Sequence, residues 1–186
     1  LAGNACLHLG AGWTILEMLD PTSAHANLDH PELMIRLADQ NAQAVLNNER
    51  PDVIAIGPGL GKSDLANAWL EATLATQKIS LVIDADALNL ISESAALLEQ
   101  LQARNLQYPG LTVLTPHPGE AAKLLKSTTD KVQADRMKAI QQLVELTQSI
   151  VALKGQNTLI ASPQHSPVRC LAGNPGMGTG GMGDVL

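Results

Sequence analysis

The chain has 186 residues, of which 45% are hydrophobic and 16% charged, and its formal net charge is −6. This length suits a single domain, which we place over residues 1–186, and the hydrophobic content is too high for a disordered chain. The acidic balance argues against nucleic acid and membrane surfaces as partners, no apolar run approaches the roughly 18 residues of a membrane span, and two distant cysteines exclude a disulfide scaffold or a zinc site.

Short apolar runs alternate with helical patterns along the chain. In order, the first half predicts helix 1–9, strand 13–19, helix 31–46, strand 53–56, a helix capped by Ser63, and strand 79–83. The second half predicts helix 92–104, strand 111–114, helices 120–125 and 130–149, and strands 150–153 and 158–161. Such strands, separated by helices, are typical of an α/β fold whose mostly parallel sheet is covered on both faces, with closing strands that we expect to be antiparallel.

Glycine-rich or polar segments follow five of the apolar runs. These segments cover residues 57–61, 84–89, 115–120, 154–158 and 174–184. Ligands of open α/β sheets bind outside the carboxyl ends of the strands. The five segments therefore predict one composite site on one edge of the sheet.

The first segment is the glycine loop Gly57–Gly61. It resembles a phosphate-binding loop of the Walker type, but Ile56 stands where that motif needs a glycine. It also departs from the dinucleotide fingerprint, because Lys62 replaces the third glycine. Gly59 and Gly61 would let the backbone approach a ligand, and the alternative is a tight strand-to-helix turn.

Asp84 follows a strand at the predicted edge, where it could hold a metal ion through water or orient a substrate hydroxyl. Its neighbour Asp86 is interpreted as a helix cap. His117 lies between two prolines, whose fixed backbone angles hold its ring in one direction and suit it to substrate contact. The alternative is a structural turn, with Glu120 in the first turn of the next helix.

Two further segments carry phosphate-type chemistry. The turn of Lys154, Gly155, Gln156, Asn157 and Thr158 could wrap a nucleotide, with Lys154 neutralising charge, although an ordinary hairpin turn is a strong alternative. The segment 173–184 has six glycines in twelve residues, includes the candidate Asn174 and ends in Asp184. Its backbone amides could hold a phosphoryl group while Asp184 accepts a proton from a hydroxyl, and the alternative for Asp184 is a helix cap.

Taken in order, the motifs GPGLG, DADALNL, TPHPGEAAKLL, ALKG and NPGMGTGGMGDVL resemble those of the ADP/ATP-dependent NAD(P)H-hydrate dehydratases. The resemblance implies a ribokinase-like, three-layer α/β/α fold that is truncated at both ends, without the family's first strand and its C-terminal helices. We therefore expect these 186 residues alone to be poorly active.

The resemblance implies repair of a damaged cofactor, in which a phosphoryl group from ADP or ATP activates the ring hydroxyl of NAD(P)H hydrate for elimination, with Mg²⁺ expected and its ligands unknown. Asp184 would be the base, Gly181 to Gly183 the anion hole, and Gly183 would lie near the nucleotide. Residues 154–158 would line the nucleotide, and Gly59, Gly61, His117 and Asp184 the hydrated dinucleotide. Asn157 stands where the family has a second glycine, but asparagine tolerates the left-handed backbone of such a turn.

The resemblance also implies an N-terminal epimerase domain in the parent protein, a homo-oligomer and a cytoplasmic location. Two other functions remain open from the residues. One is a ribokinase-like kinase of a small hydroxyl compound such as a vitamin precursor, and the other is a non-catalytic nucleotide-binding module.

Overall fold

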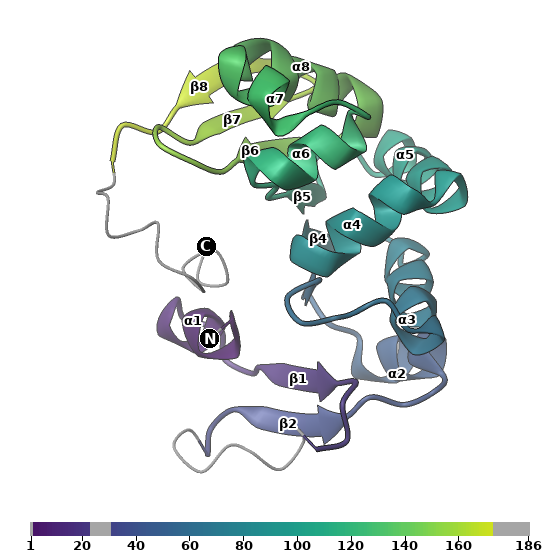
Figure 1. The fold of residues 1–186 in the computed structure, drawn as a ribbon. Coiled ribbons are helices and arrows are strands. Elements are labelled where there is room, and N and C mark those ends of the chain that lie inside the picture. Colours follow the sequence, from purple (N-terminus) through teal and green to yellow (C-terminus); the bar gives the residue numbers. More distant parts are fainter. Residues whose placement is uncertain (1, 23–30, 173–186) are drawn as a thin grey trace.

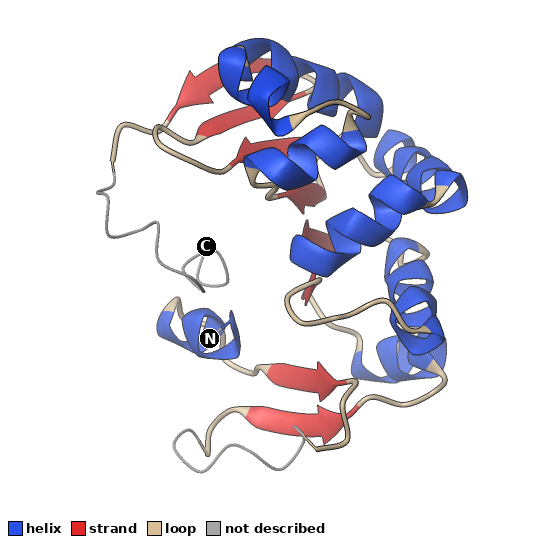
Figure 2. Cartoon of the chain, viewed as in Figure 1, coloured by secondary structure: helices blue, strands red, loops and turns tan. Residues whose placement is uncertain are grey.

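The computed structural model describes residues 2–22 and 31–172 and has a mixed α/β fold (Figures 1 and 2). Its strands are β1 (Ile15–Met18), β2 (Met34–Leu37), β3 (Val53–Ile56), β4 (Ser80–Ile83), β5 (Thr112–Leu114), β6 (Ile150–Leu153), β7 (Leu159–Ser162) and β8 (His165–Arg169). Its helices are α1 (Ala2–His8), α2 (Ala42–Glu49), α3 (Asp64–Leu74), α4 (Ala85–Glu93), α5 (Ala95–Gln107), α6 (Pro118–Leu124), α7 (Thr129–Ala134) and α8 (Arg136–Thr147). Among the helices in the described ranges, none is long and apolar enough to cross a membrane.

The larger sheet has the strand order β3-β4-β5-β6-β7-β8. Its first four strands are parallel, and β7 and β8 are antiparallel, as the sequence predicts. A separate pair of parallel strands, β1 and β2, lies at the other end of the molecule in Figure 1. The register aligns a row of apolar side chains across the larger sheet: Ile56, Ile83, Leu114, Val151 and Ala161.

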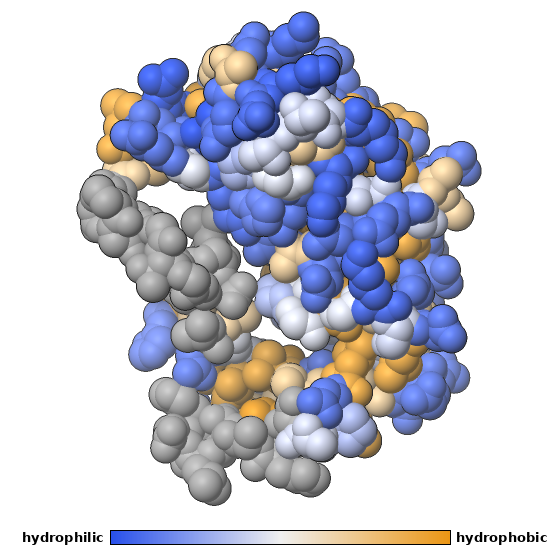
Figure 3. All heavy atoms as spheres, viewed as in Figure 1, coloured by the Kyte–Doolittle hydropathy of each residue, from blue (hydrophilic) through white to orange (hydrophobic). Residues whose placement is uncertain are grey.

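The hydrophobic core lies between this row of side chains and the helices. Every residue of the row is buried, whereas the neighbouring positions Val82, Val113 and Ala152 on the opposite face are only half-buried. The strand order explains the difference, because successive right-handed crossovers in one direction place all their helices on one face. The outward surface of these helices is mostly hydrophilic (Figure 3).

Three predicted helices differ from the observed ones. The helix over 31–46 is wrong in its first half, because Met34–Leu37 pairs with β1 as a strand and the helix begins only after the N-cap Asn41. The helix over 92–104 is two helices, interrupted at Ser94, which ends α4 and caps α5. The helix over 130–149 is interrupted at Asp135, whose side chain accepts a hydrogen bond from the amide of Lys138 and so starts α8.

Candidate functional site

Four of the five predicted segments meet at the carboxyl edge of the parallel strands. Hydrogen bonds of the sheet continue into them, since the amide of Asp84 donates to the carbonyl of Ile56 at 3.0 Å. The amide of Lys154 likewise donates to the carbonyl of Pro116 at 2.9 Å. The fifth segment, with the candidates Asn174, Gly181, Gly183 and Asp184, lies outside the described residues.

The glycine loop packs directly against the start of α4. Gly57 has φ +130°, and a Cβ there would lie 1.7 Å from the carbonyl oxygen of Asp84, so only glycine fits. Gly59 and Gly61 also have positive φ, but the space beside each of them is open. The loop is therefore packed tightly at Gly57 and is exposed to solvent at Gly59 and Gly61.

Asp86 does not cap α4, and that interpretation is wrong. It is the second residue of the helix, and its Oδ2 accepts a hydrogen bond from the amide of Gly61 at 2.9 Å. Asp84 occupies the N-cap position instead, without a capping hydrogen bond from its own side chain. The two carboxylates thus have different tasks: Asp86 holds the glycine loop, and Asp84 points elsewhere.

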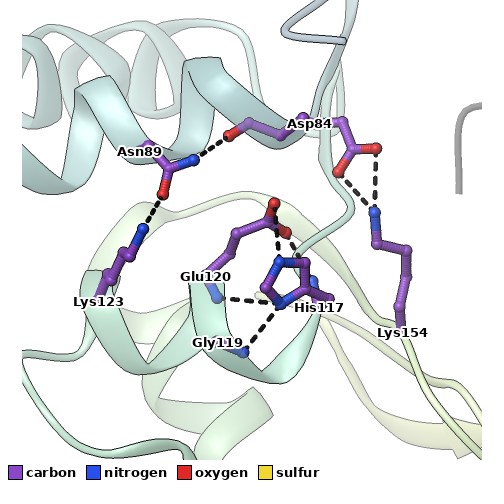
Figure 4. Close-up of polar contacts among 8 residues, drawn as sticks. Asp84, Asn89, His117, Gly119, Glu120, Lys123 and Lys154 are labelled. Carbon is purple, nitrogen blue, oxygen red and sulfur yellow. Dashed lines mark hydrogen bonds and ion pairs between the residues drawn. The ribbon is translucent and has the colours of Figure 1, made fainter. Parts of the chain in front are cut away.

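Asp84 and Lys154 form a nearly buried ion pair between the ends of β4 and β6 (Figure 4). The Nζ atom of Lys154 donates to Oδ1 of Asp84 at 2.7 Å and to Oδ2 at 3.0 Å. Their side chains are 8% and 18% exposed, respectively. Two residues that the sequence places in the site are thereby brought together, and each charge is balanced by the other.

This pairing changes how both residues are interpreted. Both oxygens of Asp84 accept from the ammonium group, so a water-bridged metal ion would have to compete with it. The positive charge of Lys154 is similarly engaged and does not stand free for a phosphate. From this geometry, the ion pair holds together the loop that follows β4 and the loop that follows β6. Within the described ranges, no group of three or more His, Cys, Asp or Glu side chains could hold a metal ion.

His117 is the N-cap of α6 (Figure 4). Its Nδ1 accepts from the amides of Gly119 at 2.9 Å and Glu120 at 3.3 Å. The carboxylate of Glu120 accepts a hydrogen bond from the amide of His117 at 2.8 Å, which completes a capping box. Its Oε1 lies 3.3 Å from Nε2 of the ring. The ring is fixed in direction, as the flanking prolines predict, yet its side chain remains 56% exposed. A capping role and a substrate contact are therefore compatible.

The two roles of His117 can be separated by substitution. Because Nδ1 caps the helix, His117→Ala should lower the free energy of unfolding by about 1 kcal/mol. Asparagine is a good N-cap but lacks the ring, so His117→Asn should retain most of the stability. Urea unfolding measures both effects. An equal loss of stability in the two variants would contradict the capping role, and a raised KM confined to the dinucleotide in His117→Asn would support substrate contact.

The turn between β6 and β7 has the backbone that the sequence predicts. Gly155 has φ +136°, and Asn157 has φ +54°, so asparagine does adopt the left-handed conformation here. The hydroxyl of Thr158 donates to the carbonyl of Gly155 at 3.2 Å and closes the turn. The segment is thus ordered as a compact loop at the edge where the other candidate segments end.

Sequence reasoning missed the side chain that supports this turn. Arg136, the first residue of α8, donates from Nη2 to the carbonyls of Leu153 at 3.0 Å and Lys154 at 3.3 Å, and from Nη1 to the carbonyl of Gln156. Burial, and next the positive charge of Arg169, lower the pKa of Arg136. The only sequence signal is an arginine beside the helix-capping Asp135, where the positive end of the helix dipole disfavours a cation.

The parallel strands and the loops at their carboxyl edge define an α/β protein, and its similarity to solved structures places its fold in the ribokinase-like class. A ribokinase-like superfamily protein from Enterococcus faecalis superimposes with a TM-score of 0.72 at 31% identity, covering 99% of this chain and 61% of that one. The chain belongs to the NAD(P)H-hydrate dehydratase family, whose sequence profile matches residues 1–186. The predicted family and the predicted ribokinase-like fold are both confirmed.

Named relatives are similar over the whole chain. The ADP-dependent (S)-NAD(P)H-hydrate dehydratase of Neisseria meningitidis is 38% identical over 100% of this chain and 60% of its own length. The bifunctional NAD(P)H-hydrate repair enzyme of Coxiella burnetii is 39% identical, but the chain spans only 36% of its length. The ADP/ATP-dependent NAD(P)H-hydrate dehydratase of Bacillus subtilis, co-crystallised with ATP and Mg²⁺, has a TM-score of 0.75 at 25% identity, over 99% of this chain and 62% of that one.

Proposed function

We propose that the protein dehydrates (S)-NAD(P)H hydrate to NAD(P)H with ADP or ATP as the phosphoryl donor. The observation that carries the proposal is that four glycine-rich or polar segments meet on one edge of the sheet in a chain of this family. The exposed glycines Gly59 and Gly61 and the fixed, exposed His117 would offer a surface for the dinucleotide, and the compact turn at 154–158 would offer one for the nucleotide.

In the proposed reaction, the ring hydroxyl of the hydrate attacks the terminal phosphorus of the donor. Asp184 accepts the hydroxyl proton, an O–P bond forms, and the bond to AMP or ADP breaks as that group leaves. The new phosphate then departs with the electron pair of its C–O bond, while a proton is lost from the neighbouring ring carbon. NAD(P)H, inorganic phosphate and AMP or ADP are the products, and no electron acceptor is needed.

Within this proposal, the amides of Gly181 and Gly183 would stabilise the transferring phosphoryl group. Gly59, Gly61 and His117 would contact the hydrated dinucleotide, and the backbone of residues 154–158 would line the nucleotide. Mg²⁺ would be bound mainly through the nucleotide phosphates and water, which is its usual mode in phosphoryl-transfer sites. This mode is compatible with an Asp84 that is committed to Lys154.

Product analysis of the natural full-length protein tests the proposal. With ADP or ATP present, NAD(P)H hydrate should regain the absorbance of reduced nicotinamide and release inorganic phosphate in equal amounts. A stable phosphorylated product would instead favour a ribokinase-like kinase. Tight ADP binding without either product would favour a non-catalytic nucleotide-binding module.

We further propose that the full-length protein works in the cytoplasm as a homo-oligomer and is fused to an epimerase domain. The names of several relatives describe bifunctional repair enzymes, of which the chain spans 34–36%. An epimerase supplies the (S) form that the dehydratase consumes, so fusion would keep the two steps together. Size-exclusion chromatography with light scattering tests the oligomeric state, an epimerase assay on the full-length protein tests the fusion, and cell fractionation tests the location.

A further inference from the structure

Arg136 occupies an unusual place for a cation. It is the first residue of α8, directly after the N-cap Asp135, and the first turn of this helix contains no acidic residue. The helix dipole makes the N-terminal end positive, so a guanidinium group there is destabilising unless other contacts compensate. The hydrogen bonds of its two Nη atoms compensate for this unfavourable position.

The guanidinium group holds one short stretch of backbone. Its two Nη atoms donate to three carbonyls within residues 153–156, those of Leu153, Lys154 and Gln156. It also packs against Gly155, where an added Cβ would lie 3.2 Å from Nη2. A planar fork of donors can reach several carbonyls at once, which the single ammonium of lysine cannot do in the same geometry.

The charge of Arg136 has no acidic partner among the residues that the structure describes. Its hydrogen bonds go to neutral carbonyls, its Nε is buried without a partner, and the positive charge of Arg169 lowers its pKa in addition to burial. Lys154, by contrast, is neutralised by Asp84. Arg136 therefore contributes a positive charge beside this turn that no described acidic side chain pairs with.

We propose that Arg136 is a positioning residue for nucleotide binding: it fixes the backbone of residues 153–156 for the ADP or ATP that the proposed function requires. Its charge adds attraction for an anionic ligand at the same turn. The inference rests on the proposed function for the identity of the ligand. The support of the turn itself is an independent statement about this chain.

Arg104 provides a control, because it is another arginine that binds backbone carbonyls, although it is buried whereas Arg136 is half-buried. It donates to the carbonyls of Thr76 and Ile79 in the loop before β4, at the opposite edge of the sheet. Arg136→Gln and Arg104→Gln should both lower the melting temperature of the full-length protein. Only the Arg136 variant should affect the nucleotide turn.

The experiment measures ADP binding by calorimetry in the wild type, Arg136→Gln, Arg136→Lys and Arg104→Gln. We expect Arg136→Gln to raise the Kd for ADP by about tenfold, equivalent to about 1.4 kcal/mol, and Arg104→Gln to leave it unchanged. Arg136→Lys should remain weakened, because it retains the charge but not the fork. In turnover assays, the KM for the nucleotide should rise while the KM for NAD(P)H hydrate stays within about twofold of the wild-type value.

Hydrogen exchange of the amides of residues 154–157 tests the support of the turn without any ligand. Exchange should accelerate in Arg136→Gln and not in Arg104→Gln. Unchanged exchange together with a wild-type Kd in Arg136→Gln would overturn the proposal, and a full recovery of the Kd in Arg136→Lys would overturn the positioning role in favour of charge alone. Failure of the proposed function is recognised separately, as a wild type that forms no NAD(P)H or binds no ADP.

Discussion

Replacing Lys154 with methionine should lower the free energy of unfolding by about 3 kcal/mol, the lower end of the range for breaking a buried ion pair. The cause is the carboxylate of Asp84, which is 8% exposed and would lose its counter-charge. The lower end applies because Lys154 itself is 18% exposed, so that water can enter its place. Urea unfolding followed by circular dichroism measures the loss.

Two further variants test whether the loss of stability comes from the unpaired negative charge of Asp84. Adding Asp84→Asn to Lys154→Met removes the negative charge of Asp84 and should restore part of the stability. The double variant would then be more stable than the sum of the two single losses predicts. The matched control is Lys62→Met, which breaks a pair with Glu93 whose side chains are 51% and 52% exposed. Exposed pairs contribute little, so this control should unfold almost like the wild type. An equal loss at Lys62 and Lys154 would contradict the buried-pair argument.

The same pair shows what sequence reasoning could and could not provide. That Asp84 and Lys154 lie on one edge follows from each ending an apolar run, and this was predictable. Their direct contact joins residues 70 positions apart and depends on the order of β4, β5 and β6. Strand order is a tertiary property, so the sequence indicated a shared edge but not which partners meet across it.

Local signals explain the other successes and errors. The strand Val53–Ile56 and the cap at Ser63 were predicted at their observed positions, because an apolar run bounded by turn residues and a serine cap are local features. The sequence of Met34–Leu37 predicts a helix, but the structure has a strand. The strand is stabilised by pairing with β1, which the local sequence does not indicate. Arg136 was missed because its three carbonyl partners lie 17–20 residues further along the chain and reach it only once α8 and β6 pack together.

The largest effect on activity is expected at Asp184. If Asp184 accepts the hydroxyl proton, Asp184→Asn should reduce kcat by about 10³, within the range for loss of a positioned general base. The amide retains a similar shape, so the Kd for ADP should stay within about twofold of the wild-type value, since an interaction made only in the transition state leaves ground-state binding intact. Rapid-mixing measurements of NAD(P)H absorbance and of phosphate release provide the rates.

The matched control for Asp184 is Asp130→Asn, an exposed carboxylate in the first turn of α7 that should leave kcat unchanged. A kcat in Asp184→Asn above about a tenth of the wild-type value would be too large for loss of the base and would leave Asp184 with a capping role. If the rates of NAD(P)H formation and of phosphate release fall together in Asp184→Asn without accumulation of a phosphorylated hydrate, the base acts before or at phosphoryl transfer. If instead a phosphorylated hydrate accumulates, transfer proceeds without Asp184 and the carboxylate serves the elimination step.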